Sequence, residues 1–356
     1  MKTQTTHRRV LIASIGLVAA MGTLAACGSS SSGSSSSASG AASSGAASSS
    51  GAASSSAAAT VTDVSMGIEP WIGYAPWYIA QEKGYFAAHN LNVKIVNFQT
   101  DADRNAAIVA GKTDVSNVDT GRIVQFADTG QPTVPLLLED ASVGADAILS
   151  DPAITTPQQL IGQTVSYEYG TTSDLLLHYY LNANGIKEDQ IKSENVPAAN
   201  AGALLIAGKS PVVVTYQPYI GEATSGANAS KAHVLFGSDK APGLISDWLI
   251  ANKDWLAANP AAAKDLIAAW NDSVAFYNSN HDEAVAIMAK GVGAKPADLT
   301  ETLAGVKIYS GAEVKALVTS GELATQIKGV SDTLLTMGKI KAAVELSKLA
   351  DLSNLD

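Results

Sequence analysis

Carboxylates and aromatic rings recur together in six short segments of this chain, and these segments hold no lysine or arginine. The segments are 69–77, 117–121, 139–146, 167–174, 216–218 and 246–248. Their acidic residues include Asp119, Asp140, Asp146, Glu168, Asp174 and Asp247, and their aromatic residues include Trp71, Tyr74, Trp77, Tyr169 and Tyr216. A carboxylate beside an aromatic face attracts an ammonium, amidine or guanidinium group by ion pairing and cation–π contact. Brought together, these side chains would suit a small cation.

The residue types that carry catalysis are not arranged for it in this sequence. The histidines are scattered without the spacing of metal ligands, at His7, His89, His178, His233 and His281. The motifs of a nucleophile elbow, a Walker phosphate loop and a dinucleotide-binding glycine loop are absent. The single cysteine excludes an intramolecular disulfide and a Cys-based zinc site. We therefore expect a binding protein without cofactor or metal, and not an enzyme.

The first 59 residues predict export and a membrane tether. Three basic residues precede the uncharged apolar run 10–24, which is shorter than a membrane span but suits a secretory signal. The run is followed by Ala-Ala-Cys27, which resembles the lipobox of bacterial lipoproteins and implies acylation of Cys27. An ordinary signal peptide with an incidental cysteine is the alternative. Residues 28–59 are all Gly, Ser or Ala, so they predict a flexible tether with a reach of roughly 30 Å.

The remaining chain alternates strand-like and helical patterns, which predicts an α/β fold. Strand patterns fall at 92–98, 113–118, 135–138, 212–214 and 248–250. The segment 101–111 reads as a helix with an acidic start and a glycine end, and helical windows follow near 261–277, 283–290 and 323–349. Residues 60–356 carry a formal charge of −13, which argues against a nucleic-acid binder.

Three segments carry a resemblance to a known family. Pro76 to Phe86 follows the pattern P-x-x-x-A-x-E-K-G-x-F, and the chain continues with A-G-K-T-D-V at 110–115 and T-Y-Q-P-Y at 215–219. These motifs resemble the nitrate/sulfonate/taurine type of ABC-transporter substrate-binding proteins, close to the group also named for thiamine-pyrimidine synthesis proteins. The resemblance extends over about residues 64–254. One departure is Pro211, which requires the following strand to begin after it or to lie at a sheet edge.

The resemblance implies a periplasmic-binding-protein-like fold of type II, with two lobes, a two-strand hinge and a helical C-terminal cap. Residues 60–149 and 247–356 would form lobe 1, and residues 150–246 would form lobe 2. Residues 1–26 would be the signal peptide, and 27–59 the lipidated cysteine with its tether. The implied protein is a monomer on the outer face of the cytoplasmic membrane. It would capture a small solute between the lobes and deliver it to the permease and ATPase subunits of an ABC importer.

On this fold the six acidic and aromatic segments would surround the interlobe cleft, at the carboxyl ends of strands. The expected ligand-binding residues are Trp71, Tyr74, Trp77, Asp119, Thr120, Asp140, Asp146, Tyr169, Thr171, Thr172, Tyr216 and Asp247. Several have a second interpretation. Trp77 suits a helix core, Asp119 and Thr120 suit a helix cap, and Asp140 and Asp146 suit a solvated turn.

The charge of the ligand is the point on which the residues and the family diverge. The family's best-known ligands are anions or zwitterions, bound with the help of a Lys or Arg. The acidic segments of this chain favour a small cationic or amine-bearing solute instead. A sulfonate- or nitrate-like anion and a pyrimidine precursor of thiamine are the alternatives, and Arg122, just outside its segment, would oppose the cation if it folded into the cleft. A thiamine-pyrimidine synthesis-type enzyme would need a His-rich active segment, which the sequence lacks.

Overall fold

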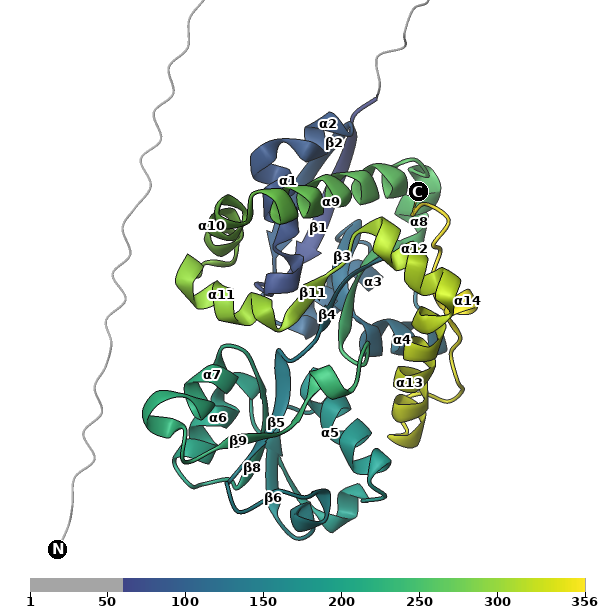
Figure 1. The fold of residues 1–356 in the computed structure, drawn as a ribbon. Helices are drawn as coiled ribbons and strands as arrows, with labels where there is room; N and C mark the ends of the chain where they lie inside the picture. The colour runs from purple at the N-terminus through teal and green to yellow at the C-terminus, as the bar shows by residue number, and fades with distance from the viewer. Residues whose placement is uncertain (1–59, 356) are drawn as a thin grey trace, which may run out of the picture. The chain divides into compact units, whose positions relative to one another are not determined.

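The computed structural model describes residues 60–355, which form two lobes, each built on its own β-sheet (Figure 1). The strands of lobe 1 are β1 (Thr62–Ile68), β2 (Leu91–Asn97), β3 (Val115–Asp119), β4 (Thr133–Ser142), β10 (Ser246–Asn252) and β11 (Val306–Ile308), in the order β11-β4-β10-β3-β1-β2. The strands of lobe 2 are β5 (Asp146–Ser150), β6 (Thr164–Tyr167), β7 (Lys192–Asn195), β8 (Val212–Tyr216) and β9 (His233–Gly237), in the order β7-β6-β8-β5-β9.

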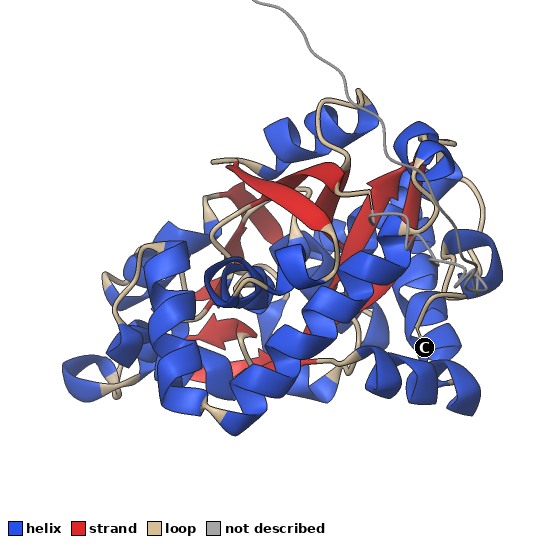
Figure 2. Cartoon of the chain, turned by 90° about the horizontal axis from the view of Figure 1, so that it is seen from above, coloured by secondary structure: helices blue, strands red, loops and turns tan. Residues whose placement is uncertain are grey.

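Helices surround both sheets (Figure 2). Lobe 1 carries α1 (Pro76–Lys83), α2 (Tyr85–Ala88), α3 (Asp101–Val109), α4 (Thr120–Asp128), α8 (Lys253–Ala258), α9 (Ala262–Ser279), α10 (His281–Val292), α11 (Pro296–Ala304), α12 (Gly311–Ser320), α13 (Glu322–Thr336) and α14 (Leu346–Leu349). Lobe 2 carries α5 (Thr172–Ala183), α6 (Ala198–Ile206) and α7 (Tyr219–Thr224). Single 3-10 turns lie at η1 (Ile72–Tyr74), η2 (Pro157–Leu160), η3 (Glu188–Gln190), η4 (Gly226–Asn228) and η5 (Ser238–Lys240).

The family motif near the N-terminus forms α1, and its residue types explain both helix ends. Pro76 occupies the first turn, where a missing N–H costs nothing, and Gly84 ends the helix with a left-handed φ of 77°. Trp77 is fully buried and packs between Phe86 and Trp270, with ring centroids 5.8 and 4.9 Å away. This packing holds α1 against α9 and fixes the direction in which η1 enters the site.

The strand and helix patterns of the sequence are confirmed for β2, β3, β4, α3 and β10, with shifts of a few residues at their ends. Two differences concern the lobes. The segment 146–149, expected to end the first part of lobe 1, belongs to β5 of the second sheet, so the chain crosses at 143–145. The C-terminal part, expected to be all helical, contributes the edge strand β11, whose Val-Lys-Ile sequence alternates buried and exposed residues. The strand after Pro211 begins at the next residue, as expected.

Helix α13 touches both lobes, packing on α4 of lobe 1 and on α5 of lobe 2 (Figure 1). Just beyond it, the Nζ atom of Lys339 lies 3.9 Å from the Oδ2 atom of Asp174 in α5. The two lobes are therefore joined by two chain crossings and by this helix. Within residues 60–355, none of the helices has the length and apolar character needed to cross a membrane.

Candidate ligand-binding cleft

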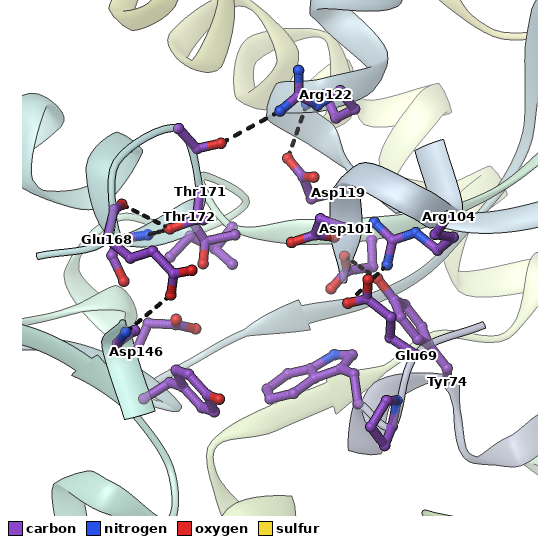
Figure 3. Close-up of a pocket in the computed structure, with 18 of the residues that line it drawn as sticks. Glu69, Tyr74, Asp101, Arg104, Asp119, Arg122, Asp146, Glu168, Thr171 and Thr172 are labelled. Carbon is purple, nitrogen blue, oxygen red and sulfur yellow. Dashed lines mark hydrogen bonds and ion pairs between the residues drawn. The ribbon is translucent and has the colours of Figure 1, made fainter. Parts of the chain in front are cut away.

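A cavity of about 300 Å³ lies between the lobes, which is the size of a small-molecule site (Figure 3). Lobe 1 and the return crossing line it with Glu69, Pro70, Trp71, Tyr74, Gln99, Asp101, Arg104, Asp119, Arg122, Ile245 and Asp247. Lobe 2 lines it with Asp146, Glu168, Gly170, Thr171, Thr172, Ser173, Ala198 and Tyr216. Most of these residues follow the carboxyl ends of strands, so the site is placed as open α/β sheets place theirs.

Arg104 is the charged centre of the lobe 1 wall. Its side chain is 1% exposed and pairs with Asp101, one turn earlier in α3, and with Glu69 Oε2 at 3.3 Å. Burial alone would lower the pKa of Arg104. The nearby Tyr74, Asp101 and Glu69 raise this pKa by more than burial lowers it, so the guanidinium stays charged. Arg104 was not among the residues expected at the cleft, because it lies inside helix α3. Its one sequence signal was the spacing of three residues from Asp101.

Three carboxyl groups of the cleft, those of Glu69, Asp146 and Asp247, hold their protons more tightly than usual. Burial raises the pKa of Asp247 and of Glu69 to about 7, with Arg104 opposing the shift in both and the Tyr74 hydroxyl opposing it at Asp247. The Tyr74 hydroxyl donates to Asp247 Oδ1 at 2.7 Å. Burial also raises the pKa of Asp146 to about 6, against a hydrogen bond with Ser142. The cleft thus contains carboxyl groups that one arginine does not fully compensate.

Two further acids lie behind the lobe 1 wall and do not reach the cavity. Glu139 is fully buried and accepts hydrogen bonds from Trp77 Nε1 at 2.5 Å and from Asn117 Nδ2 at 2.7 and 2.8 Å. Its neighbour Asp140 is also fully buried and accepts from Trp71 Nε1 at 3.3 Å. Burial raises the pKa of Glu139 to about 8 and that of Asp140 well above its usual range. Asp140 thus holds the indole group of Trp71 in the first loop, and Glu139 holds that of Trp77 in α1.

Five of the eight lobe 2 residues that line the cavity come from one short segment, 168–173, at the start of α5. Gly170 adopts a left-handed φ of 75°, which turns the chain into the helix. The Thr171 hydroxyl accepts the Ser173 backbone N–H at 3.3 Å and donates to the Glu168 carbonyl at 2.9 Å. The Glu168 carboxylate accepts the Ala198 backbone N–H at 2.9 Å, so this acid is tied to α6. This wall presents hydroxyl groups and backbone N–H groups.

Arg122 spans the two walls. Its backbone N–H donates to Asp119 Oδ1 at 2.9 Å, which makes Asp119 the N-cap of α4. Its guanidinium donates to Gln125 Oε1 at 3.1 Å and across the cleft to the Gly170 carbonyl at 3.4 Å (Figure 3). The Nε atom of Arg122 is buried without a partner among the described residues.

The structure brings eight of the twelve expected ligand-binding residues to the cavity. They are Trp71, Tyr74, Asp119, Asp146, Thr171, Thr172, Tyr216 and Asp247. The others lie elsewhere. Trp77 is a core side chain and Asp140 is sealed behind Trp71. The buried Thr120 hydroxyl contacts Ser246 at 2.6 Å and accepts from Trp248, and Tyr169 is 44% exposed and packs on Tyr167 outside the cavity.

The expectation of a cleft without basic residues is corrected by Arg104 and Arg122, since both line it. The acids of the lining still outnumber them. They are Glu69, Asp101, Asp119, Asp146, Glu168 and Asp247. Asp174, also expected at the cleft, instead accepts the Gly170 N–H at 2.8 Å and pairs with His178 at 2.8 Å. Among residues 60–355, no group of three or more His, Cys, Asp or Glu side chains is placed to hold a metal ion.

Similarity to known proteins was found at the levels of fold and of family. The periplasmic aliphatic sulphonate binding protein SsuA from Escherichia coli aligns with a TM-score of 0.67 at 17% identity, over 82% of this chain and 98% of that one. The alkanesulfonate-binding protein SsuA from Xanthomonas axonopodis pv. citri, bound to MOPS, aligns with a TM-score of 0.64 at 15% identity, over 83% of this chain and all of that one. The shared fold is therefore that of periplasmic binding proteins.

Sequence comparison agrees. A protein of Brucella abortus (strain 2308), named as a candidate binding protein, is 24% identical over 271 residues, which cover 75% of this chain and 83% of that protein. Residues 71–284, more than half of the chain and all of the cleft except parts of its first loop, match the family model described as NMT1/THI5 like. The chain belongs to the NMT1/THI5-like family.

Proposed function

We propose that this protein is the solute-binding component of an ABC importer and that its solute carries a positive charge. The observation that carries the proposal is a small interlobe cavity in which six carboxyl groups face two arginines. The fold and the family support the transport role. The acidic lining supports the choice of a cationic or amine-bearing solute, because a buried carboxyl group needs a nearby cation to offset its desolvation.

The two arginines of the cleft do not neutralise all of its carboxyl groups, so negative charge remains for a solute cation to compensate. Arg104 is already engaged by Glu69 and Asp101, so it does not compensate Asp247 or Asp146 fully. A solute ammonium between Asp146 of lobe 2 and Asp247 of lobe 1 would contact both lobes. Binding would then favour the closed arrangement, because a ligand shifts an equilibrium by its difference in affinity for the two states. Trp71 and Tyr216 would supply aromatic faces.

An anionic solute is the second candidate, and Arg122 is the observation that favours it. Its guanidinium has a buried Nε without a partner among the described residues, and it lies beside the start of α5, where backbone N–H groups favour negative charge. A sulfonate- or nitrate-like anion could use this end of the cleft. A pyrimidine precursor of thiamine, held between aromatic side chains, is the third candidate. The scattered histidines favour none of the catalytic alternatives.

Export and anchoring complete the proposal. Cys27 and the segment before residue 60 lie outside the described residues, so the lipid anchor rests on the sequence pattern. The mature protein would be a monomer tethered to the outer face of the cytoplasmic membrane, with a permease and an ATPase as partners and no role in nucleic-acid binding. Cys27→Ala should release the protein into the medium or leave an unprocessed precursor. Firm membrane attachment of a processed Cys27→Ala protein would contradict the anchor.

A thermal-shift screen tests the ligand class directly. Quaternary ammonium compounds, diamines and guanidino compounds form one panel, and alkanesulfonates, taurine and nitrate form the other. A solute at 100 times its dissociation constant stabilises the fold by about 2.7 kcal/mol. We expect stabilisation from the first panel and compaction in small-angle scattering with the same solute. Stabilisation by the second panel alone would exclude the cationic solute while retaining the transport role.

A further inference from the structure

Asp140 and Asp247 stand side by side on neighbouring strands with no positive charge between them. They are register partners in the antiparallel pair β4–β10, where directly opposed side chains lie within contact distance. Their side chains are within hydrogen-bonding reach of each other. Asp140 is fully buried and Asp247 is 6% exposed. Two like charges at this distance in a buried site are strongly unfavourable.

The contacts of each oxygen show what the pair lacks. Asp140 Oδ1 accepts from Trp71 Nε1, whereas Oδ2 is buried and receives no hydrogen bond from the described residues. Gly73 of η1 closes over this oxygen so tightly that a Cβ at position 73 would collide with it. Asp247 Oδ1 accepts from the Tyr74 hydroxyl. Two carboxyl groups that contact each other, one with an unpartnered oxygen, require a proton between them.

We propose that Asp140 is a positioning residue that remains a protonated carboxylic acid at neutral pH, donating to Asp247 while accepting from Trp71. Asp140 thereby orients a carboxylate and an aromatic wall of the cleft without touching the solute. The pair carries one negative charge instead of two, which matches a solute with a single positive charge at this point. This charge match rests on the proposed function, whereas the protonation of Asp140 does not.

The surroundings of the pair favour the shared proton. The titratable and charged groups that face it are Glu69, Tyr74, Arg104, Asp119, Glu139, Asp146 and Tyr309. Only Arg104 among these is basic, and it is occupied by Glu69 and Asp101. The others are acids or phenols, which make a second negative charge on the pair less favourable. Burial raises the pKa of Asp140 and also that of Asp247.

The test uses the purified protein without added solute, so it is independent of the transport proposal. Carbon-13 NMR of the aspartate carboxyl groups is followed from pH 5 to 8 in the wild type and in Asp140→Asn. We expect the Asp140 signal to stay at the carboxylic-acid position at pH 7, and Asp247 to titrate at the same or a higher pH in Asp140→Asn, because an amide donates less strongly to the ionised Asp247 than a carboxylic acid does. An ionised Asp140 beside an ionised Asp247 at pH 7 would overturn the proposal.

Stability against pH gives a second readout. Because the folded pair has raised pKa values, the native state binds more protons than the unfolded chain above about pH 4, and stability falls as pH rises. Asn keeps a donor and an acceptor but does not titrate. As pH rises, the melting temperature of Asp140→Asn should therefore increase relative to that of the wild type by roughly 3 °C per pH unit. Asp140→Leu should lose the Trp71 indole hydrogen bond, whereas Asp140→Asn should keep it. A constant difference across pH, equal for both variants, would reduce Asp140 to a packing residue.

Discussion

The two walls of the cleft differ in the chemical groups that they present to a solute. Lobe 1 presents charged side chains that are buried and held by partners far away in the sequence, such as the hydrogen bond between Tyr74 and Asp247 across 173 positions. Apart from Asp146, Ala198 and Tyr216, lobe 2 lines the cavity with one short segment, 168–173, whose hydroxyl and backbone groups are arranged by local hydrogen bonds. Charge in a rigid wall selects the sign of a solute. Hydroxyl and N–H groups at a helix start bind a wider range of polar groups. Lobe 1 therefore selects the charge of the solute, and lobe 2 tolerates different polar groups on it.

The largest effect should come from the charged centre of lobe 1. Arg104→Met leaves Glu69 and Asp101 without their buried cation, and breaking a buried ion pair from one side costs about 3–5 kcal/mol. We expect that loss of unfolding free energy in urea. The matched variant Arg122→Met removes hydrogen bonds at the edge of the cleft and should cost about 1 kcal/mol. Equal losses of unfolding free energy in the two variants would contradict the role of Arg104 as the charged centre of the lobe 1 wall.

The second-largest effect should be the pH dependence of stability, which we expect the acids of lobe 1 to determine. Asp247 and Glu69 have pKa values raised to about 7, so each favours the folded state at low pH and loses that contribution as pH rises through its folded pKa. Each such group changes stability by about 1.4 kcal/mol per pH unit.

We therefore expect the melting temperature of the solute-free protein to fall between pH 5 and 6.5. This window ends at the ordinary pKa of histidine. The pKa of His178 is raised to about 9 chiefly by Asp174 against its burial, so this residue is charged when folded and mostly charged when unfolded, and it contributes little to the slope. Asp247→Asn should flatten the slope. A melting temperature that rises with pH in this window would contradict the assignment of the buried acids.

Binding should respond to Asp146, a buried acid that lobe 2 contributes to the cavity. Asp146→Asn should weaken the binding of an amine-bearing solute by more than tenfold, about 1.4 kcal/mol, because a buried carboxylate is exchanged for an uncharged amide. The solute-free melting temperature should not fall, since burial already raises the pKa of Asp146. Titration calorimetry measures the loss, with the exposed Asp189→Asn of lobe 2 as control. Tight binding of taurine or nitrate that Asp146→Asn leaves unchanged would assign the cleft to anions.

The smallest effect should come from the local hydrogen bonds of lobe 2. Thr171→Ala removes the N-cap of α5 and should lower the unfolding free energy by about 1 kcal/mol. Thr171→Ser keeps the hydroxyl and should behave as the wild type in the same urea titration. If Thr171→Ala matched Arg104→Met in its cost, the contrast between a rigid charged wall and a locally built wall would fail.

The same contrast explains what the sequence could predict. The lobe 2 wall was found from Gly170 and the hydroxyl residues after it, because a glycine turn and a helix cap are local patterns. The loop with Trp71 and Tyr74 was found from its aromatic content. Arg104 was not found, since nothing local shows which face of α3 turns toward Glu69. Asp140 was placed in the cleft because the sequence alone does not show that Gly73 and Trp71 seal it.

The lobe boundaries show a similar limit. The crossing was expected after residue 149, yet β5 pairs with β8 and so belongs to lobe 2. Strand pairing is a long-range property, and an apolar run such as 147–149 suits either sheet. The edge strand β11 is three residues long, below the length at which alternation is informative. Fold class and five of the eleven strands in the described residues were predictable; which sheet each strand joins was not.

The position of β10 in lobe 1 sets the order in which the chain can fold. This strand lies between β3 and β4 in its sheet, but it follows the whole of lobe 2 in the sequence. The sheet of lobe 2 uses only the continuous stretch 146–237, so its contacts close shorter loops. A chain that emerges from its N-terminus can therefore assemble lobe 2 while the sheet of lobe 1 still lacks a central strand. Lobe 1, which carries the selective charges, is completed last, and its half-built sheet is the surface most exposed to misassembly during synthesis.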